Sequence, residues 1–169
     1  SNAVQRVQNT MALEREYAAG QLARDASKYA ASNKETLSGT SQWSNPASDP
    51  FTDIMEGKEV IRSKTGEKPN VLTLGPKVLT ALRTHPKVLD RLTTSTDRPP
   101  ATIQQLQALF ELQQVVEGEA VYHDGTQFQD VWGKDAILAY TTPASMQEMG
   151  SPNFGYTYQL AGRPMVEEG

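Results

Sequence analysis

The sequence has no cysteine and only two histidines, His85 and His123, among its 169 residues. Disulfides, thiolate metal sites and a cysteine nucleophile are therefore excluded. Two histidines without an H-x-H or H-x-x-x-H spacing do not indicate a metal site, because such sites need several ligands at a regular spacing. No apolar run approaches the roughly 20 residues that span a bilayer, so no membrane partner is expected.

A surplus of basic residues is also missing. The net charge is −4, whereas a nucleic-acid-binding module normally presents a basic face. The hydrophobic fraction of 37% is ordinary for a soluble globular protein, and the length is sufficient for one or two compact domains with a real core. The opening Ser-Asn-Ala, residues 1–3, resembles the remnant of a cleaved tag and carries no information about the fold.

Residues 4–31 have the composition and the periodicity of a long helix. A helix of about 28 residues spans about 40 Å, which exceeds the width of a small domain. Part of this helix is therefore expected to pack on another surface. The apolar positions that form one stripe along it are Val4, Val7, Met11, Ala18, Leu22, Ala26 and Tyr29.

A second helix is predicted over residues 50–65. Asp49 provides an N-cap, a proline follows at the first helical position, and Gly66 stops the helix. The preceding residues 32–48 hold many turn formers and no sustained period. They are expected to form a loop that Leu37 and Trp43 pin to the body of the protein.

A strand, a sharp corner and two short helices are predicted after residue 70. The apolar residues 71–74 form the strand, and Gly75 and Pro76 turn the chain into a helix. His85 ends that helix, because a residue before proline disfavours helical angles. Pro86 can then start a further helical turn.

The remainder of the chain mixes helix and strand without a regular βαβ rhythm, so the expected fold class is α+β. After a loop at 93–101, Thr102 and Gln105 have the pattern of a capping box at the start of a helix. Strands are predicted at 114–123, 135–140 and 154–160.

The corner at Gly75 raises the question of a phosphate-binding site, because it combines a strand, a glycine turn and a helix that carries Lys77 in its first turn. Such a site needs several successive backbone N–H groups aimed at the anion. Pro76 removes one of them, and no G-x-x-x-x-G-K-[ST] pattern occurs. We therefore expect a structural corner, with Lys77 in solvent.

The two histidines also favour structural roles. His85 lies at a helix end, where a histidine commonly bonds nearby carbonyls, and no nucleophile or carboxylate partner stands at a recognisable spacing. His123, Asp124 and Gly125 read as the head of a hairpin turn.

The acidic and aromatic residues give no catalytic pattern either. Negative charge at the start of the second helix complements the helix dipole, and the acids around a strand discourage stray pairing. Trp132, in front of Gly133, Lys134 and Asp135, could be a ligand platform, but is expected to be a buried anchor beside a tight turn. No catalytic, cofactor-binding or metal-binding residue is predicted. The acids considered are Asp49, Asp53, Glu56, Glu111, Glu117 and Glu119.

Several segments in a fixed order resemble the major capsid proteins of tailed bacteriophages and prophages with the Hong Kong 97-like fold. The segments are KPNVLTLGPKVLTALRTHPKVLDRL, ELQQVVEGEAVYH, DVWGKDAILAY and SPNFGYTYQLAGRPMVEEG, preceded by LSGTSQWSNPASDPFTDI. The resemblance runs from about residue 10 to the end. It implies peripheral-domain helices and a connecting loop at 4–65, an axial domain at 66–142 and a return towards the peripheral domain at 143–169.

In this family an N-terminal arm and an extended E-loop precede the matched region, and a further stretch follows it. This sequence is expected to lack all three parts, so the fragment is expected to fold without forming shells. No residue matches the Lys and Asn pair through which some relatives crosslink.

The resemblance implies a structural subunit without enzymatic activity or cofactor. Copies would self-assemble into the icosahedral shell that encloses DNA, in the virion and, during assembly, in the host cytoplasm. A scaffolding protein or a maturation protease are further implied partners, and DNA would lie nearby without specific recognition. Two alternatives stay open from the sequence: the shell protein of an encapsulin-type nanocompartment, and an enzyme, such as one that binds a phosphate ligand, which uses the Gly75 corner or the region of His85.

Overall fold

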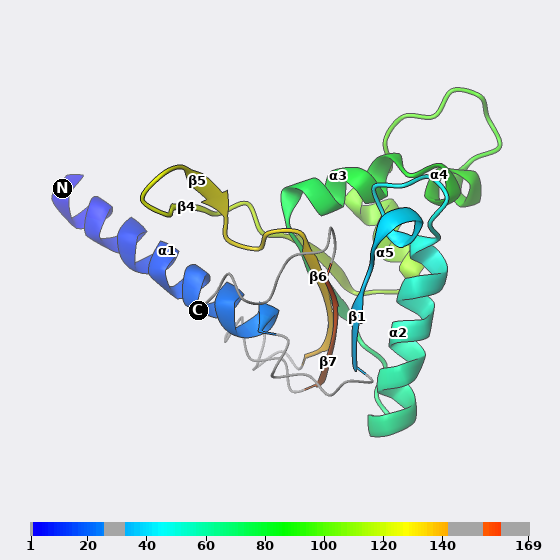
Figure 1. Ribbon diagram of the computed structural model, residues 1–169, viewed down its shortest axis with the longest axis horizontal. Helices are drawn as coiled ribbons and strands as arrows, with labels where there is room; N and C mark the ends of the chain where they lie inside the picture. The colour runs from blue at the N-terminus through cyan, green and yellow to red at the C-terminus, as the bar shows by residue number, and fades with distance from the viewer. Residues whose placement is uncertain (1, 26–32, 142–153, 160–169) are drawn as a thin grey trace.

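The computed structural model describes residues 2–25, 33–141 and 154–159, and these residues form an α+β fold, as predicted (Figure 1). The helices are α1 (Asn2–Arg24), the short 3₁₀ helix η3 (Gly39–Ser41), α2 (Pro50–Thr65), α3 (Pro76–Thr84), α4 (Pro86–Leu92) and α5 (Ile103–Phe110). The strands are β1 (Lys34–Thr36), β2 (Val71–Leu74), β3 (Gln114–Glu117), β4 (Val121–His123), β5 (Phe128–Asp130), β6 (Asp135–Tyr140) and β7 (Phe154–Gln159).

The centre of the fold is a mixed five-stranded sheet in the order β1-β7-β6-β2-β3. The strand β6 pairs antiparallel with both β2 and β7, whereas β1 and β3 add parallel strands at the two edges. The β4 and β5 strands form a separate two-stranded hairpin. Parallel edge strands require long connections, and the helices α2 to α5 lie within those connections.

The helix boundaries in the middle of the chain confirm the predicted capping signals. The Asp49 carboxylate accepts a hydrogen bond from the Thr52 amide (3.3 Å), and Gly66 ends α2 with a φ of 77°. Thr102 and Gln105 form the predicted reciprocal capping box at the start of α5. His85 separates α3 from α4, as its position before a proline indicates.

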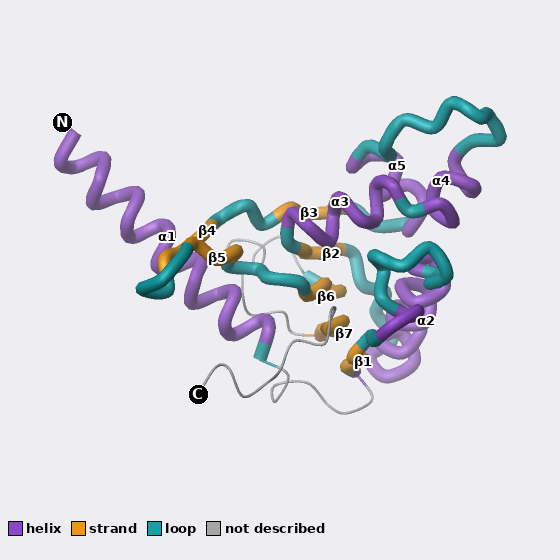
Figure 2. The backbone as a smooth tube through the Cα atoms, turned by 45° about the horizontal axis from the view of Figure 1, so that its top comes forward, coloured by secondary structure: helices purple, strands orange, loops and turns teal. Residues whose placement is uncertain are grey.

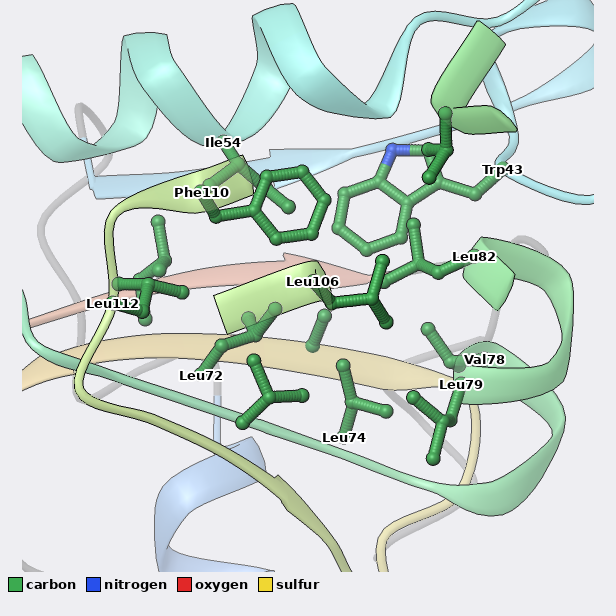
Figure 3. Close-up of a cluster of buried hydrophobic side chains, with 14 of the residues drawn as sticks. Trp43, Ile54, Leu72, Leu74, Val78, Leu79, Leu82, Leu106, Phe110 and Leu112 are labelled. Carbon is green, nitrogen blue, oxygen red and sulfur yellow. The ribbon is translucent and has the colours of Figure 1, made fainter. Parts of the chain in front are cut away.

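One hydrophobic cluster fills the space between the helices α2 to α5 and one face of the sheet (Figure 3). The rings of Trp43 and Phe110 lie side by side beneath α2, and Leu37 is also buried. The side chains of strand β6 alternate between the two faces of the sheet, since Ala136 and Leu138 belong to this cluster while Ile137 belongs to a second one. We call the part built on the main cluster the body. Its fully buried larger side chains include Trp43, Ile54, Ile61, Leu72, Leu74, Leu82, Leu106 and Phe110.

The long helix α1 and the hairpin β4-β5 lie side by side on the opposite side of the sheet and form what we call the α1–hairpin unit (Figures 1 and 2). A small cluster of Ala23, Val131, Trp132 and Ile137 joins this unit to the sheet. The first turns of α1 extend beyond the body, and all residues from 2 to 15 are exposed. The helix therefore extends past the body, while the expectation that its projecting part packs on another surface stays a prediction.

The structure corrects three sequence-based expectations. The predicted strand 114–123 is two strands in two sheets, because the chain leaves the ladder at Gly118, where a Cβ would meet the Trp132 ring at 1.9 Å. The predicted loop 32–48 contains β1, and β5 was not predicted. Both are three-residue strands whose pairing depends on partners that sequence periodicity does not reveal.

Some predictions fall outside the described residues. The helix predicted for 4–31 is described as far as Arg24, so Ala26 and Tyr29 of the predicted stripe are not described. Of the predicted return segment 143–169, only β7 is described, and its position beside β6 confirms the predicted last strand.

Candidate functional site

One side of α1 is held by its own chain through contacts with the hairpin region. The Trp132 indole N–H donates to the Glu16 carboxylate (3.1 Å), and the Tyr17 ring meets the edge of the Tyr122 ring at a centroid distance of 4.8 Å. At Gly20 an added Cβ would lie 2.8 Å from the Val131 side chain, so this close approach requires glycine. These contacts define the inward side of the helix.

The last turn of α1 is fixed to β6 by a buried ion pair. Arg24 donates from Nε to the Asp135 carboxylate (2.9 Å) and from Nη1 to the Val131 carbonyl (2.8 Å). The side chains are 8% and 0% exposed, respectively, for Arg24 and Asp135. Buried charges of this kind are stable only when they are paired, so the orientation of α1 on the sheet depends on this pair.

The apolar stripe of α1, which we define as Val4, Val7, Met11, Ala18 and Leu22, faces away from these contacts. At about 100° per residue, the stripe centres about 180° around the helix from Glu16, Gly20 and Arg24. Its larger side chains are 44% to 59% exposed. The predicted stripe therefore exists, but among the described residues it is a surface and not a core.

The hairpin adds apolar surface beside α1. Phe128 is 71% exposed and Val121 is 42% exposed. The Phe128 ring stands edge-on to the His123 ring at a centroid distance of 5.0 Å. Exposed apolar groups gathered on neighbouring elements are typical of interaction surfaces.

Residues 124–127 connect β4 to β5, so Asp124 and Gly125 lie in the hairpin turn that the sequence predicted, directly after His123. The Asp124 carboxylate accepts hydrogen bonds from the Thr126 and Gln127 amides at 2.8 and 2.9 Å, and Gly125 has a φ of 99°. These backbone hydrogen bonds hold the pKa of Asp124 below its ordinary value. The sequence signal for the turn was thus correct, while the exposed Phe128 beside it was missed.

The Gly75 corner is built as a packing contact. A Cβ at this position would lie 2.4 Å from the Gly133 carbonyl oxygen, so two backbone segments meet here. A carbonyl oxygen at the turn repels anions, which makes the corner a poor phosphate site. Lys77 is exposed, as expected, and Trp132 is a buried anchor next to the turn at Gly133, whose φ is 58°.

His85 is buried at the joint between α3 and α4 and bonds through both ring nitrogens. Its Nδ1 accepts a hydrogen bond from the Lys87 amide (3.1 Å), while Nε2 lies 3.1 Å from the Asn45 carbonyl and 2.9 Å from the Ser48 hydroxyl. Burial lowers the pKa of His85, and the nearby Lys87 ammonium lowers it further. The prediction that His85 bonds nearby carbonyls at a helix end is confirmed.

The acidic residues at the start of α2 serve local structure. Asp49 caps the helix, and the Asp53 carboxylate accepts a hydrogen bond from the Trp43 indole (2.9 Å). Burial raises the pKa of Asp53, and the negative charges of Glu56 and Asp49 act in the same direction. Within residues 2–25, 33–141 and 154–159, no three His, Cys, Asp or Glu side chains are grouped to hold a metal ion.

At the other acidic segment, partial burial raises the pKa of Glu117, and the neighbouring Glu119 carboxylate adds to the effect. Glu117 is the last residue of the edge strand β3 and Glu119 lies just after it, in line with the expected charged strand edge. In the part of the chain that the structure describes, no helix combines the length and apolar composition that a membrane span requires.

The comparison with known proteins decides the family. Residues 9–166 match the family model described as phage major capsid protein E. The chain belongs to this family. The match covers α1 from residue 9 onward, the hairpin and the body, and it includes Met11, Ala18 and Leu22 of the exposed stripe but not Val4 and Val7.

Individual relatives agree with this assignment. A major capsid protein of Burkholderia phage BcepMu is 34% identical over 172 aligned residues, which cover 98% of this chain and 55% of the relative. A major capsid protein of Pseudomonas phage JBD67 is 33% identical over 168 residues, with 96% and 53% covered. The chain therefore spans about half the length of these relatives.

A solved structure has the same fold. The crystal structure of a phage-related protein from Bordetella bronchiseptica RB50 matches with a TM-score of 0.83 and 30% sequence identity. The match covers 97% of this chain and 67% of that protein. The arrangement of the body and the α1–hairpin unit is thus shared with an experimentally determined neighbour.

Proposed function

We propose that this chain is part of a structural subunit of a phage or prophage head, which self-assembles into the shell that encloses DNA. The observation that carries the proposal is the family match over residues 9–166, together with the exposed apolar stripe on the outward side of α1. A shell protein acts through repeated contacts between copies, so its function resides in surfaces of this kind. The virion is the proposed final location, after assembly in the host cytoplasm.

The stripe is a suitable contact because it is apolar, linear and rigidly presented. Burying the exposed side chains of Val4, Val7 and Met11 against another copy stabilises an interface by about 25 cal/mol per Å² of apolar surface removed from water. The Arg24–Asp135 ion pair and the Trp132–Glu16 hydrogen bond fix the helix that presents them. A rigid helix loses little conformational entropy on association, which favours binding.

The fold is proposed to be Hong Kong 97-like, with axial and peripheral parts. The predicted division at residue 65/66 separates α2 from α3, yet Ile54 and Ile61 of α2 share one cluster with Leu72 and Val78. This shared core supports grouping α2 with the axial part and taking the α1–hairpin unit as the peripheral part. The predicted absence of an N-terminal arm and E-loop, and the proposed scaffold, protease and DNA partners, stay predictions.

The two alternatives are less well supported. The curated relatives above are phage capsid proteins, which does not favour an encapsulin-type compartment. An enzyme that binds a phosphate ligand at the Gly75 corner is opposed by the Gly133 carbonyl at that turn. The family is a structural one.

The proposal is tested by electron microscopy of the complete natural protein with and without charges on the stripe. We expect shells or capsomers from the unmodified chain and dispersed subunits from the Val7→Asp and Met11→Asp double variant, since buried unpaired carboxylates oppose association. The Gln5→Asp and Asn9→Asp double variant is the matched control, because it adds the same two charges with the same spacing off the stripe. It should assemble.

Two other outcomes would distinguish the proposed shell function from the proposed role of the stripe as an interface. If the complete chain stays monomeric at several salt concentrations and pH values, even beside the other head proteins of its phage, the shell function is wrong. If both double variants assemble as well as the unmodified chain, the shell function stands and the stripe is not an interface.

A further inference from the structure

We propose that His85 is a proton-operated latch, which holds the segment 44–49 against the α3–α4 joint when neutral and releases it when protonated. This inference concerns the body and does not depend on shell assembly. The segment leads into α2, and Asp49 at its end is the α2 N-cap. His85 itself is 2% exposed.

The hydrogen bonds around the ring fit only its neutral form. Because Nδ1 accepts the Lys87 N–H, the ring proton lies on Nε2, which faces the Asn45 carbonyl and the Ser48 hydroxyl. The Ser48 hydroxyl donates to the same Asn45 carbonyl (2.7 Å), which closes a triangle of three polar groups. A single neutral imidazole thus caps α4 and anchors the segment.

Protonation breaks this arrangement at a defined atom. A proton on Nδ1 would oppose the Lys87 amide N–H, so two donors would meet where one hydrogen bond had been. The N-cap of α4 would be lost, and the buried cation would need access to water. Rotation of the ring towards solvent would also break its contacts to Asn45 and Ser48.

Charged side chains on each neighbouring element act on His85 or bind the segments beside it. Lys87 of α4 opposes the protonated ring, and Asp49 of the segment favours it. Arg83 of α3 donates its Nε–H to the Ala101 carbonyl (2.6 Å). The Lys87 ammonium also donates to the Ala47 carbonyl (3.0 Å), so the segment has a second, exposed contact with α4.

The release is expected to be local. Trp43, just before the segment, is 1% exposed in the main cluster and donates to Asp53 (2.9 Å), which holds the chain on that side. On the other side α2 packs into the body through Ile54. The two fixed ends leave 44–49 as the part that can open.

The direction of the pH effect follows from the linkage between proton binding by His85 and the opening of segment 44–49. The pKa of His85 is lowered in the closed form from its ordinary 6.5, so the open form binds protons more readily. The closed form is therefore fully favoured above about 6.5 and loses stability as the pH falls below that value. Each pH unit below it raises the opening constant by up to about tenfold.

Amide hydrogen exchange by NMR between pH 7.5 and 5.0, corrected for intrinsic rates, tests the latch. We expect the Asn45, Ser48 and Lys87 amides to open more at low pH, by up to about tenfold per pH unit, while amides of the β2–β6 ladder keep their protection. His85→Asn should remove this pH dependence, because asparagine can cap α4 but does not titrate. His123→Asn is the matched control, and should behave as the unmodified chain.

Several results would overturn the proposal. They are a flat profile in the unmodified chain, loss of the pH dependence in His123→Asn, or parallel loss of ladder protection, which would mean global unfolding. If His85→Asn does not fold, the NMR titration of the His85 ring in the unmodified chain decides. A pKa at or above about 6.5, or a titration without changes at Asn45 and Ser48, contradicts the latch.

Discussion

The body and the α1–hairpin unit of this chain are stabilised in different ways. The body buries large apolar side chains from four helices and the sheet in one cluster. The α1–hairpin unit buries only a small cluster and is attached by an ion pair, an indole hydrogen bond and close backbone contacts at glycines. The difference indicates that the body supplies stability, whereas the α1–hairpin unit presents surface.

Replacing one phenylalanine in each region by alanine should give the largest difference in stability between the body and the α1–hairpin unit. Phe110→Ala removes a ring that is 0% exposed in the body and should lower the free energy of unfolding by about 3–5 kcal/mol. Phe128→Ala removes a ring that is 71% exposed on the hairpin and should change it by less than about 0.5 kcal/mol. Urea denaturation of the monomeric chain measures both. Equal effects would contradict the division into a stabilising body and a surface unit.

The elements of the body were predicted from the sequence more accurately than those of the α1–hairpin unit, because most of them are marked by signals in neighbouring residues. The α2 and α5 boundaries follow from caps, the strand β2 from an apolar run, and the corner at Gly75 from its Gly-Pro pair. Each of these signals lies within a few residues of the element it defines. Periodicity also placed the stripe on α1 correctly.

What the sequence did not reveal depends on contacts between distant segments. Strand β1 exists because it pairs with β7, and the break at Gly118 exists because Trp132 packs against it. Lys58 was not singled out, although its ammonium donates to the Phe110 carbonyl (2.7 Å) at the end of α5 and burial lowers its pKa. Whether a stripe faces a core or solvent is likewise set by where the rest of the chain packs.

A second prediction concerns the Arg24–Asp135 ion pair, which attaches the α1–hairpin unit to the body. Arg24→Met removes the Arg24 guanidinium from the buried Asp135 carboxylate and should cost about 3 kcal/mol, because the ion pair that helps to offset the desolvation of this charge is lost. Amide exchange should show the larger loss of protection in α1 and the smaller in α5. Arg62→Met, which breaks an exposed pair with Glu59, is the control and should leave the denaturation midpoint unchanged. Uniform loss of protection in both helices would mean that the pair supports the whole fold and not the attachment of α1.

The smallest expected change in stability comes from two exposed threonines, one at the start of a helix in the body and one inside α1. Thr102 caps α5 in the body by accepting the Gln105 amide (3.1 Å), so Thr102→Ala should cost about 1 kcal/mol. Thr10 lies within α1, where its hydroxyl donates to the Arg6 carbonyl (2.9 Å), and alanine has the higher helix propensity at such a site. Thr10→Ala should therefore leave stability within about 0.3 kcal/mol of the unmodified chain or raise it slightly. Because both substitutions remove the same atoms, a loss at Thr10 comparable to that at Thr102 would show that the projecting turns of α1 contribute to stability as much as the body does.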